Sequence, residues 1–276
     1  MISIIICSRT GVVNQNLSQN IAASIGAEYE LVPVDNSANR YSIFEAYNEG
    51  VSQAKGEILC FMHEDVLFRT ESWGKIIENH FLDDSIGLIG FAGSHFLPST
   101  PMYWYSSPFV SQRNLNNDDG VVEEHFHEDW FGNNNLIDVC VCDGLCFFVR
   151  RSLFETIHFD ENTYKGFHMY DMDICMQVLQ TGKRVCVCRD VLVEHRWSEK
   201  KQFTKQGGDA FFANLKLFAE KWKKQLPIWR GLTMIPEEAF EKIDDLYRQL
   251  YSAKLVRLSK AYRLGRFLLH PFKSRK

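Results

Sequence analysis

Long hydrophobic runs are missing from this chain of 276 residues. No stretch approaches the roughly 18 consecutive apolar residues that cross a bilayer as a helix, so the sequence predicts no transmembrane segment. The apolar run at residues 2–7 is also too short, and neither a basic segment nor a small-residue cleavage site accompanies it. We therefore expect no secretory signal and a cytoplasmic location.

An overall excess of positive charge is absent as well. The formal net charge is -4, which argues against a surface adapted to nucleic acid, and we expect no nucleic-acid partner. The distribution is uneven, because residues 254–276 carry eight Lys or Arg and no Asp or Glu, interleaved with large apolar side chains. This pattern predicts a basic amphipathic tail that binds an anionic membrane surface, which would place the protein peripherally at the inner face of the cell membrane. A terminal helix packed on the body, or a disordered tail, remains the alternative.

The cysteines lack the spacing of a zinc site. Cys140 and Cys142 are separated by one residue, as are Cys186 and Cys188, whereas paired zinc ligands are usually two to four residues apart. Most of the eight cysteines lie in apolar runs. We expect free, buried thiols in a reducing compartment.

What the sequence does contain is an alternation of strand-like and helix-like segments. Short links between them predict an α/β fold with parallel strands covered by helices. Residues 98–135 interrupt the pattern with no sustained periodicity, and their aromatic content favours a functional loop over plain disorder. Strands are expected at residues 2–7, 29–34, 57–62, 86–91, 136–141, 147–149 and 184–188, and helices at 14–25, 42–54, 71–81, 152–157, 171–181 and after 197.

Acidic residues and a histidine follow the predicted strands or open a predicted helix. The apolar run within residues 56–65 ends in two adjacent carboxylates. The carboxyl ends of parallel strands meet at one edge of a sheet, where open α/β sheets bind ligands. Carboxylates gathered there can hold a divalent cation, which in turn can hold a diphosphate. The residues concerned are Asp35, Glu64, Asp65, Asp171, Asp173, Glu194 and His195.

A series of motifs runs through the first 200 residues, at residues 2–9, 34–37, 46–50, 56–65, 143–144, 159–161, 170–175, 181–185 and 193–195. In this order they resemble family 2 glycosyltransferases over roughly residues 1–200, and within that family a bacterial, streptomycin-biosynthesis-like branch. The resemblance implies an α/β GT-A fold, with a Rossmann-like mixed sheet flanked by helices. The helical spacing of Phe211, Leu215, Phe218 and Trp222 predicts a helical C-terminal extension over residues 201–276.

The resemblance also implies roles for individual residues. Asp171 matches the catalytic base, and Asp65 and His195 match the ligands of a Mn²⁺ or Mg²⁺ ion. Asn36 takes the place of Asp35 if the alignment slips by one. The positions implied for the nucleotide sugar are Ser8, Arg9, Asp35, Asn36, Asn48, Glu64, Asp143 and Gly144.

Two positions depart from the family pattern. His63 stands where the family's metal motif begins with Asp, and Tyr170 stands where a Glu usually precedes the base. The first departure leaves Asp65 as the only acid in its expected place, which bears on the strength of metal binding. The second removes a carboxylate that would tune the base, and it leaves Asp171 and Asp173 on the opening turn of a helix.

Further residues are candidates for the acceptor. Trp104 and Tyr105 carry rings on which a sugar face can stack, and Asp173 lies two residues beyond the base in the sequence. Each candidate also has a structural alternative: core packing for the aromatic and histidine side chains, turn formation for Asp35, and interaction with the helix dipole for the two helical acids.

The resemblance therefore implies a metal-dependent, inverting glycosyltransferase. Its donor would be a nucleotide diphosphate sugar, UDP-linked by the resemblance, and its acceptor a glycan or lipid-linked glycan. One alternative is a non-catalytic nucleotide-sugar or glycan-binding protein of the same fold. A sugar nucleotidyltransferase is a weaker alternative, because residues 9–13 contain a single glycine where that class has a glycine-rich loop.

Overall fold

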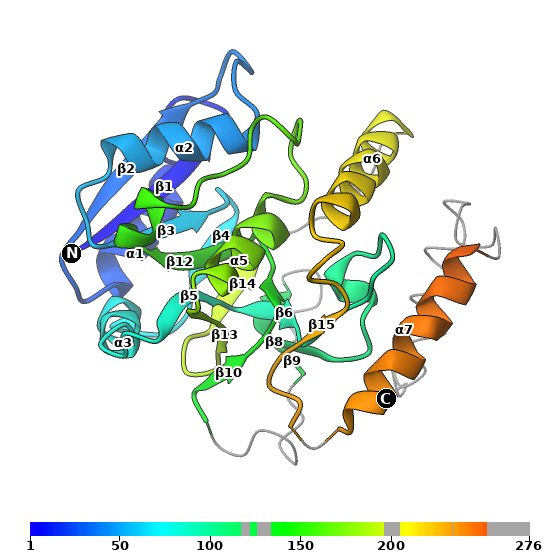
Figure 1. Ribbon diagram of the computed structural model, residues 1–276. Helices are drawn as coiled ribbons and strands as arrows, with labels where there is room; N and C mark the ends of the chain where they lie inside the picture. Colours follow the sequence, from blue (N-terminus) through cyan, green and yellow to red (C-terminus); the bar gives the residue numbers. More distant parts are fainter. Residues whose placement is uncertain (117–121, 126–133, 196–204, 234, 253–276) are drawn as a thin grey trace, which may run out of the picture.

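A seven-stranded sheet forms the centre of the computed structural model, which describes residues 1–116, 122–125, 134–195, 205–233 and 235–252 (Figure 1). The sheet is flanked by helices, which confirms the α/β class. In sheet order the strands are β10 (Leu136–Asp138), β13 (Arg184–Cys188), β5 (Ile86–Gly90), β12 (Cys146–Arg150), β3 (Ile58–Met62), β1 (Ile2–Ser8) and β2 (Tyr29–Asp35).

The sheet is mixed. β1 pairs in parallel with β2 and β3, and β13 pairs in parallel with β5. β12 runs antiparallel between β3 and β5, and β10 is antiparallel to β13. This confirms the mixed sheet that the family resemblance implies. The alternation of strands and helices alone indicated parallel strands, and β12 and β10 depart from that expectation, while β1, β2, β3, β5 and β13 still end at the same edge.

The helices lie close to their predicted positions. They are α1 (Gln15–Ser24), α2 (Ile43–Gln53), α3 (Trp73–His80) and α5 (Tyr170–Gln180). Ser42 and Glu45 form a reciprocal capping box that fixes the start of α2. Gly50 allows α2 to approach the sheet, because a Cβ there would lie 2.3 Å from Cγ2 of Ile5. The helix expected at 152–157 is instead a short 3-10 helix, η2 (Arg151–Glu155).

A second sheet lies beyond the first and carries part of the site. Its order is β11 (Val141–Cys142), β6 (Ala92–Ser94), β8 (Val110–Asn116), β14 (Val193–His195) and β4 (Val66–Phe68), and β9 (Val122–His125) pairs with β8. Residues 98–135, expected to form a loop, thus contain an antiparallel β8–β9 pair and the 3-10 turn η1 (Trp104–Ser106). Their polar, Asn-rich composition hid the strand periodicity.

The C-terminal part contains α6 (Lys205–Lys221) and α7 (Glu237–Ser252). Phe211, Leu215, Phe218 and Trp222 join the main core, as their helical spacing predicted. α7 packs Phe240 and Tyr247 into a smaller cluster with Phe96, beside a short pairing of β15 (Ile228–Trp229) with β7 (Phe96–Leu97). The division of the chain at residue 200 stays a prediction.

The basic tail at 254–276 lies outside the described residues. Among the helices that the structure does describe, none combines the length and apolarity required to cross a membrane. All eight cysteines are unpaired, and all but Cys7 are buried, as their apolar surroundings predicted.

Candidate active site

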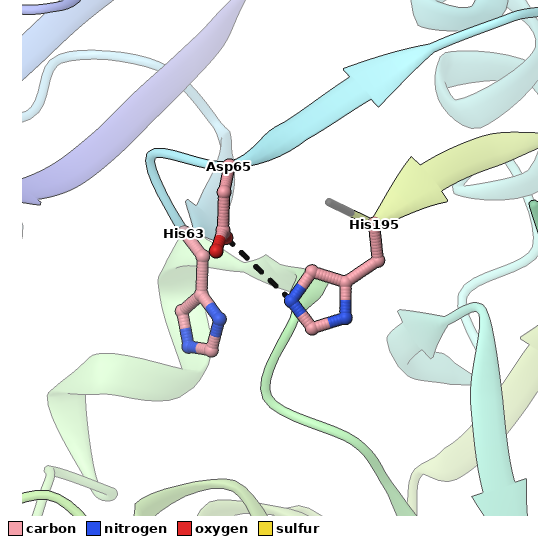
Figure 2. Close-up of side chains that lie close together, drawn as sticks. All are labelled: His63, Asp65 and His195. Carbon is pink, nitrogen blue, oxygen red and sulfur yellow. Dashed lines mark ion pairs between the residues drawn. The ribbon is translucent and has the colours of Figure 1, made fainter. Parts of the chain in front are cut away.

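His63, Asp65 and His195 come together at the edge of the sheet (Figure 2). His63 follows β3, Asp65 directly precedes β4, and His195 is the last residue of β14. The antiparallel register of β14 with β4 sets His195 opposite Val66, the neighbour of Asp65 in sequence. His195 Nε2 lies 3.5 Å from Asp65 Oδ1, and one ligand atom from each of the three residues lies within 4.8 Å of the others.

The electrostatics of this cluster suit a cation. Burial alone would raise the pKa of Asp65, but hydrogen bonding and charge from His195, with a contribution from His63, hold it at about 2. Burial, followed by the neighbouring His195, lowers the pKa of His63 to about 4. At neutral pH the cluster therefore offers an ionised carboxylate and a neutral His63 imidazole, the forms that ligate metals. Two imidazoles and a carboxylate fit a divalent transition ion.

Glu64 does not join the cluster of its sequence neighbours His63 and Asp65 but contacts Arg9 and Ser8. Arg9 Nε lies 3.1 Å from its Oε2, and Ser8 Oγ lies 3.2 Å from its Oε1. The predicted donor residues Ser8, Arg9 and Glu64 are thus joined in one network. A cavity of about 200 Å³ adjoins them, lined by Asn14, Asn16, Leu17, Glu64, Asp65 and Leu67.

The structure separates the roles of Asp35 and Asn36. Asp35 ends β2 opposite Ser8 and is exposed, and the backbone N–H of Ser37 donates to its Oδ1 at 2.9 Å, which lowers the carboxyl pKa. Asn36 instead closes a loop, because its side-chain amide accepts from Tyr41 N and donates to Tyr41 O, each at 2.9 Å. Of the two, Asp35 is the side chain with an exposed carboxylate for a ligand.

Asn48 lies in α2 and is engaged elsewhere. Its side chain donates to the carbonyl of Phe159 at 2.8 Å and to Glu161 at 2.9 Å, and it accepts from Phe159 N at 3.0 Å. These bonds attach residues 159–161 to α2. Its assignment to the nucleotide stays a prediction, and the hydrogen bonds give it a structural role.

Asp171, the predicted base, lies in the first turn of α5 and is 5% exposed. Gly144 N donates to its Oδ2 at 3.0 Å, and Met172 N donates to its Oδ1 at 2.9 Å. Burial, followed by the charge of Asp143, raises its pKa to about 7. Asp143 accepts from Leu145 N at 2.9 Å and from the hydroxyl of Tyr103 at 3.3 Å. A carboxyl whose pKa is near neutrality can both accept and release a proton at physiological pH.

The two departures from the family pattern are in direct contact. His63 Nε2 and the Tyr170 hydroxyl lie 2.7 Å apart, and that hydroxyl donates to the carbonyl of Gly144 at 3.0 Å. Position 144 must be glycine here, because a Cβ would lie 2.1 Å from the Tyr170 oxygen.

Asp173 is a structural residue in this geometry. It is 1% exposed, and its carboxylate accepts from Tyr164, Gln177, Lys221 and Trp222 at 2.8–3.0 Å. These bonds join α5 to α6, so its assignment to the acceptor finds no support in its contacts.

The aromatic candidates also differ. Trp104 is 3% exposed and sits in the main core, with its ring edge-on to Tyr105. Tyr105 is half-buried and is the better placed of the two for a ligand.

Glu194 is fully buried and pairs with Arg69. Because successive strand residues face opposite sides, Glu194 points away from the cluster that His195 joins.

Sequence reasoning named His63 and Tyr170 as departures but gave neither of them a site role. The signal was present, since both positions fall inside site motifs and both replace a carboxylate. The contact of Tyr103 with Asp143 had no such signal, because 40 residues separate the two in the sequence.

Comparisons with known proteins agree with these features. A family model described as "Glycosyltransferase like family" matches residues 3–221. The streptomycin biosynthesis protein StrF of Streptomyces griseus is 28% identical over 159 residues, which cover 56% of this chain and 53% of that protein. The chain thus spans about half the length of this curated relative.

Two solved structures align with most of the chain. GalNAc-T7 with UDP, GalNAc and Mn²⁺ is 11% identical, with a TM-score of 0.49 and coverage of 71% of this chain and 43% of that one. TarS 1-349 of S. aureus in complex with UDP-GlcNAc is 14% identical, with a TM-score of 0.47 and coverage of 76% and 64%.

Proposed function

Because the chain belongs to the glycosyltransferase-like family whose model matches residues 3–221, we propose that it transfers a sugar from a nucleotide diphosphate donor to a glycan or lipid-linked acceptor. The donor nucleotide is UDP on the family resemblance alone. The observation that supports the proposal is the contact of His63, a member of the His63, Asp65 and His195 cluster, with Tyr170, the residue before the proposed base.

Asp65 and His195, the two ligands that the family resemblance implies, would hold a Mn²⁺ or Mg²⁺ ion, and His63 lies beside them. A divalent cation supplies charge neutralisation to the diphosphate leaving group. Asp35, exposed at the end of β2, is available to the base or ribose, and the network of Ser8, Arg9 and Glu64 lies between that position and the cluster.

Asp171 is the proposed general base. Its Oδ1 and Oδ2 are held by the amides of Met172 and Gly144, which fix the orientation of the carboxylate. A pKa of about 7 gives it enough basicity to accept the proton of an acceptor hydroxyl as that oxygen attacks the sugar. A single displacement with a base on the acceptor side inverts the anomeric centre.

A non-catalytic binding protein is the second candidate. The replacement of an acid by His63 and the pairing of Glu64 with Arg9 favour it. A sugar nucleotidyltransferase has less support, because that class has a glycine-rich loop after the first strand and the loop after β1 contains only Gly11. Gly11 also has a packing role, since a Cβ there would lie 3.0 Å from Asp35 Oδ1.

The place of action is part of the proposal. We infer a peripheral location at the inner face of the cell membrane from the composition of residues 254–276, which lie outside the described residues. A flotation assay with liposomes containing phosphatidylserine tests this directly. Full-length protein should float more than a chain ending at Tyr251, and equal flotation of the two would remove the membrane proposal.

A thermal-shift panel tests the donor site. Nucleotides and nucleotide sugars are each added with Mn²⁺, Mg²⁺ or EDTA, since a ligand at about 100 times its dissociation constant adds about 2.7 kcal/mol of stability. We expect a metal-dependent shift with UDP that disappears in Asp65→Ala. Release of UDP from the responding UDP-sugar then distinguishes an enzyme from a binding protein. Absence of any nucleotide shift would overturn the donor-site assignment.

A further inference from the structure

The Tyr170 hydroxyl links His63 to the backbone of Gly144. It lies 3.0 Å from the Gly144 carbonyl, which can only accept, and 2.7 Å from His63 Nε2, which can donate or accept according to its tautomer. Both contacts are satisfied together when the hydroxyl donates to the carbonyl and its oxygen accepts from a protonated His63 Nε2. The lone pair of the neutral ring is then on Nδ1.

The ring is held in a direction that suits this lone pair. Figure 2 shows the ring of His63 below Asp65, with Nδ1 on the side that faces Asp65 and His195. His195 presents Nε2 to the same space, 3.5 Å from Asp65 Oδ1. Among the described residues, the hydrogen bond of the His63 ring is the one made through Nε2, which leaves Nδ1 for a ligand.

We propose that His63 is a direct ligand of the divalent cation through Nδ1, with Tyr170 as its positioning residue, and that the resulting two-imidazole, one-carboxylate set selects Mn²⁺ over Mg²⁺. The inference rests on the proposed function for the presence of a metal, and it assigns the ligand and the preference. It turns the two departures from the family pattern into one compensating pair.

Ligand chemistry gives the reason for the preference. Mg²⁺ favours oxygen ligands and keeps much of its water, whereas imidazole nitrogen suits transition ions. A family-like carboxylate at position 63 would supply oxygen and a second negative charge, while His63 supplies a neutral nitrogen. The Tyr170–His63 bond acts as the outer partner that metal-ligating histidines usually have.

The test is a titration of the full-length protein with Mn²⁺, in which the electron paramagnetic resonance signal of free Mn²⁺ measures how much is bound. The titration is repeated with Mg²⁺ as a competitor. We expect wild type to prefer Mn²⁺ at least about tenfold, and loss of the outer partner in Tyr170→Phe to weaken Mn²⁺ binding by about 10–100-fold. Tyr164→Phe is the matched control, because it also removes a buried hydroxyl, one that donates to Asp173 at 3.0 Å.

Two substitutions of His63 separate ligation from packing. In His63→Gln the amide reaches the position of Nε2 and can keep the contact with Tyr170, but Nδ1 is lost, so Mn²⁺ affinity should fall. In His63→Asp an oxygen stands near the Nδ1 position, so the Mn²⁺ preference over Mg²⁺ should shrink. Unchanged Mn²⁺ affinity in folded His63→Gln would overturn the inference.

Pulsed electron paramagnetic resonance of Mn²⁺-loaded wild type gives an answer that needs no variant. Modulation from two imidazole nitrogens is expected, and modulation from one would contradict ligation by His63. The outcomes also separate the two proposals. UDP-sugar turnover with a single coordinated imidazole would support the proposed function and contradict this inference. Two coordinated imidazoles without turnover would support this inference and contradict the proposed function.

Discussion

Lys221 Nζ lies 2.9 Å from the buried carboxylate of Asp173, and the indole N–H of Trp222 donates to the same carboxylate at 2.8 Å. Two consecutive residues at the end of α6 are thereby attached to the helix that carries Asp171. The position of α5 at the site therefore depends on a polar anchor 48 residues away in the sequence.

Asp173→Asn should destabilise the fold without affecting metal binding. The substitution removes one of the two carboxylates that Lys221 contacts, the other being Asp160 with its Oδ2 2.7 Å from Nζ. It also replaces one acceptor oxygen of a fully used buried carboxylate by a donor, which we expect to cost about 1–3 kcal/mol. Thermal unfolding measures the loss. Asp209→Asn, exposed on α6, is the control and should leave the melting temperature nearly unchanged. A stable Asp173→Asn variant with a raised KM for the acceptor would restore the acceptor role.

Asp171→Asn should abolish most turnover. Loss of a general base typically costs about 10²–10⁴-fold in kcat, while UDP and Mn²⁺ binding should persist because the amide keeps the contact with Gly144 N. In wild type, kcat/KM should rise with pH through about 7, the pKa of Asp171. Single-turnover sugar transfer measures both, and turnover within twofold of wild type would exclude Asp171 as the base.

Asp171→Asn, which should lower turnover, should raise the stability of the fold at high pH. Because the folded state raises the pKa of Asp171 to about 7, folding favours the protonated form, and this contribution to stability is lost as pH rises from about 4 through 7. Asp171→Asn, which cannot ionise, should therefore be more stable than wild type at pH 8 and lose that advantage at pH 4. Equal pH dependence of unfolding in the two proteins would contradict the raised pKa.

Asp143→Asn should move the pH profile of activity. The charge of Asp143 is the second cause of the raised pKa of Asp171, after burial. Without that charge the base ionises at lower pH, so the acidic limb of kcat/KM should shift toward lower pH. A fall in activity with an unmoved limb would mean that Asp143 acts on substrate rather than on the base.

Gly144→Ala should disturb the site through Tyr170. The added methyl group would lie 2.1 Å from the Tyr170 oxygen, and overpacking of this kind typically costs about 1–3 kcal/mol. Displacement of Tyr170 should also release His63 and weaken Mn²⁺ binding. Gly208→Ala is the control, since its Cβ meets nothing within 4 Å. Wild-type stability and Mn²⁺ affinity in Gly144→Ala would contradict the packing argument.

Asp35→Ala should weaken UDP binding with little loss of stability, because the side chain is exposed at the end of β2. Asn36→Ala should do the reverse, since it removes both hydrogen bonds to Tyr41. Isothermal titration with UDP and thermal unfolding together measure the pair. Weaker UDP binding in Asn36→Ala alone would assign the nucleotide contact to Asn36.

Sequence periodicity predicted the central layer well, because β1, β3 and β5 are short apolar runs bounded by glycine or charge. The sequence also predicted that Asp65 and His195 lie close together, but it placed both at the edge of the central sheet. His195 does not end a strand of the central sheet. It reaches Asp65 through β14 and β4, a pairing across 127 residues that local pattern cannot show.

The remaining misses have related causes. Asp171 and Asp173 look equivalent in sequence, yet one faces Gly144 and the other faces Lys221 and Trp222. Which side of α5 meets the site depends on how α6 packs, and α6 lies far along the chain. The strands β8 and β9 were missed because polar residues dominate them, and their pairing supplies what their hydropathy does not.

β14 has β4 on one side and β8 on the other. The strand that ends in His195, a proposed metal ligand, is thus held in part by a segment of the region 98–135, which also contains the residues proposed for the acceptor. On these proposed assignments, acceptor recognition and cation binding would be coupled through one shared strand. A chimera that exchanges this region would then have to preserve the edge of β8, or it would lose the cation together with the old specificity.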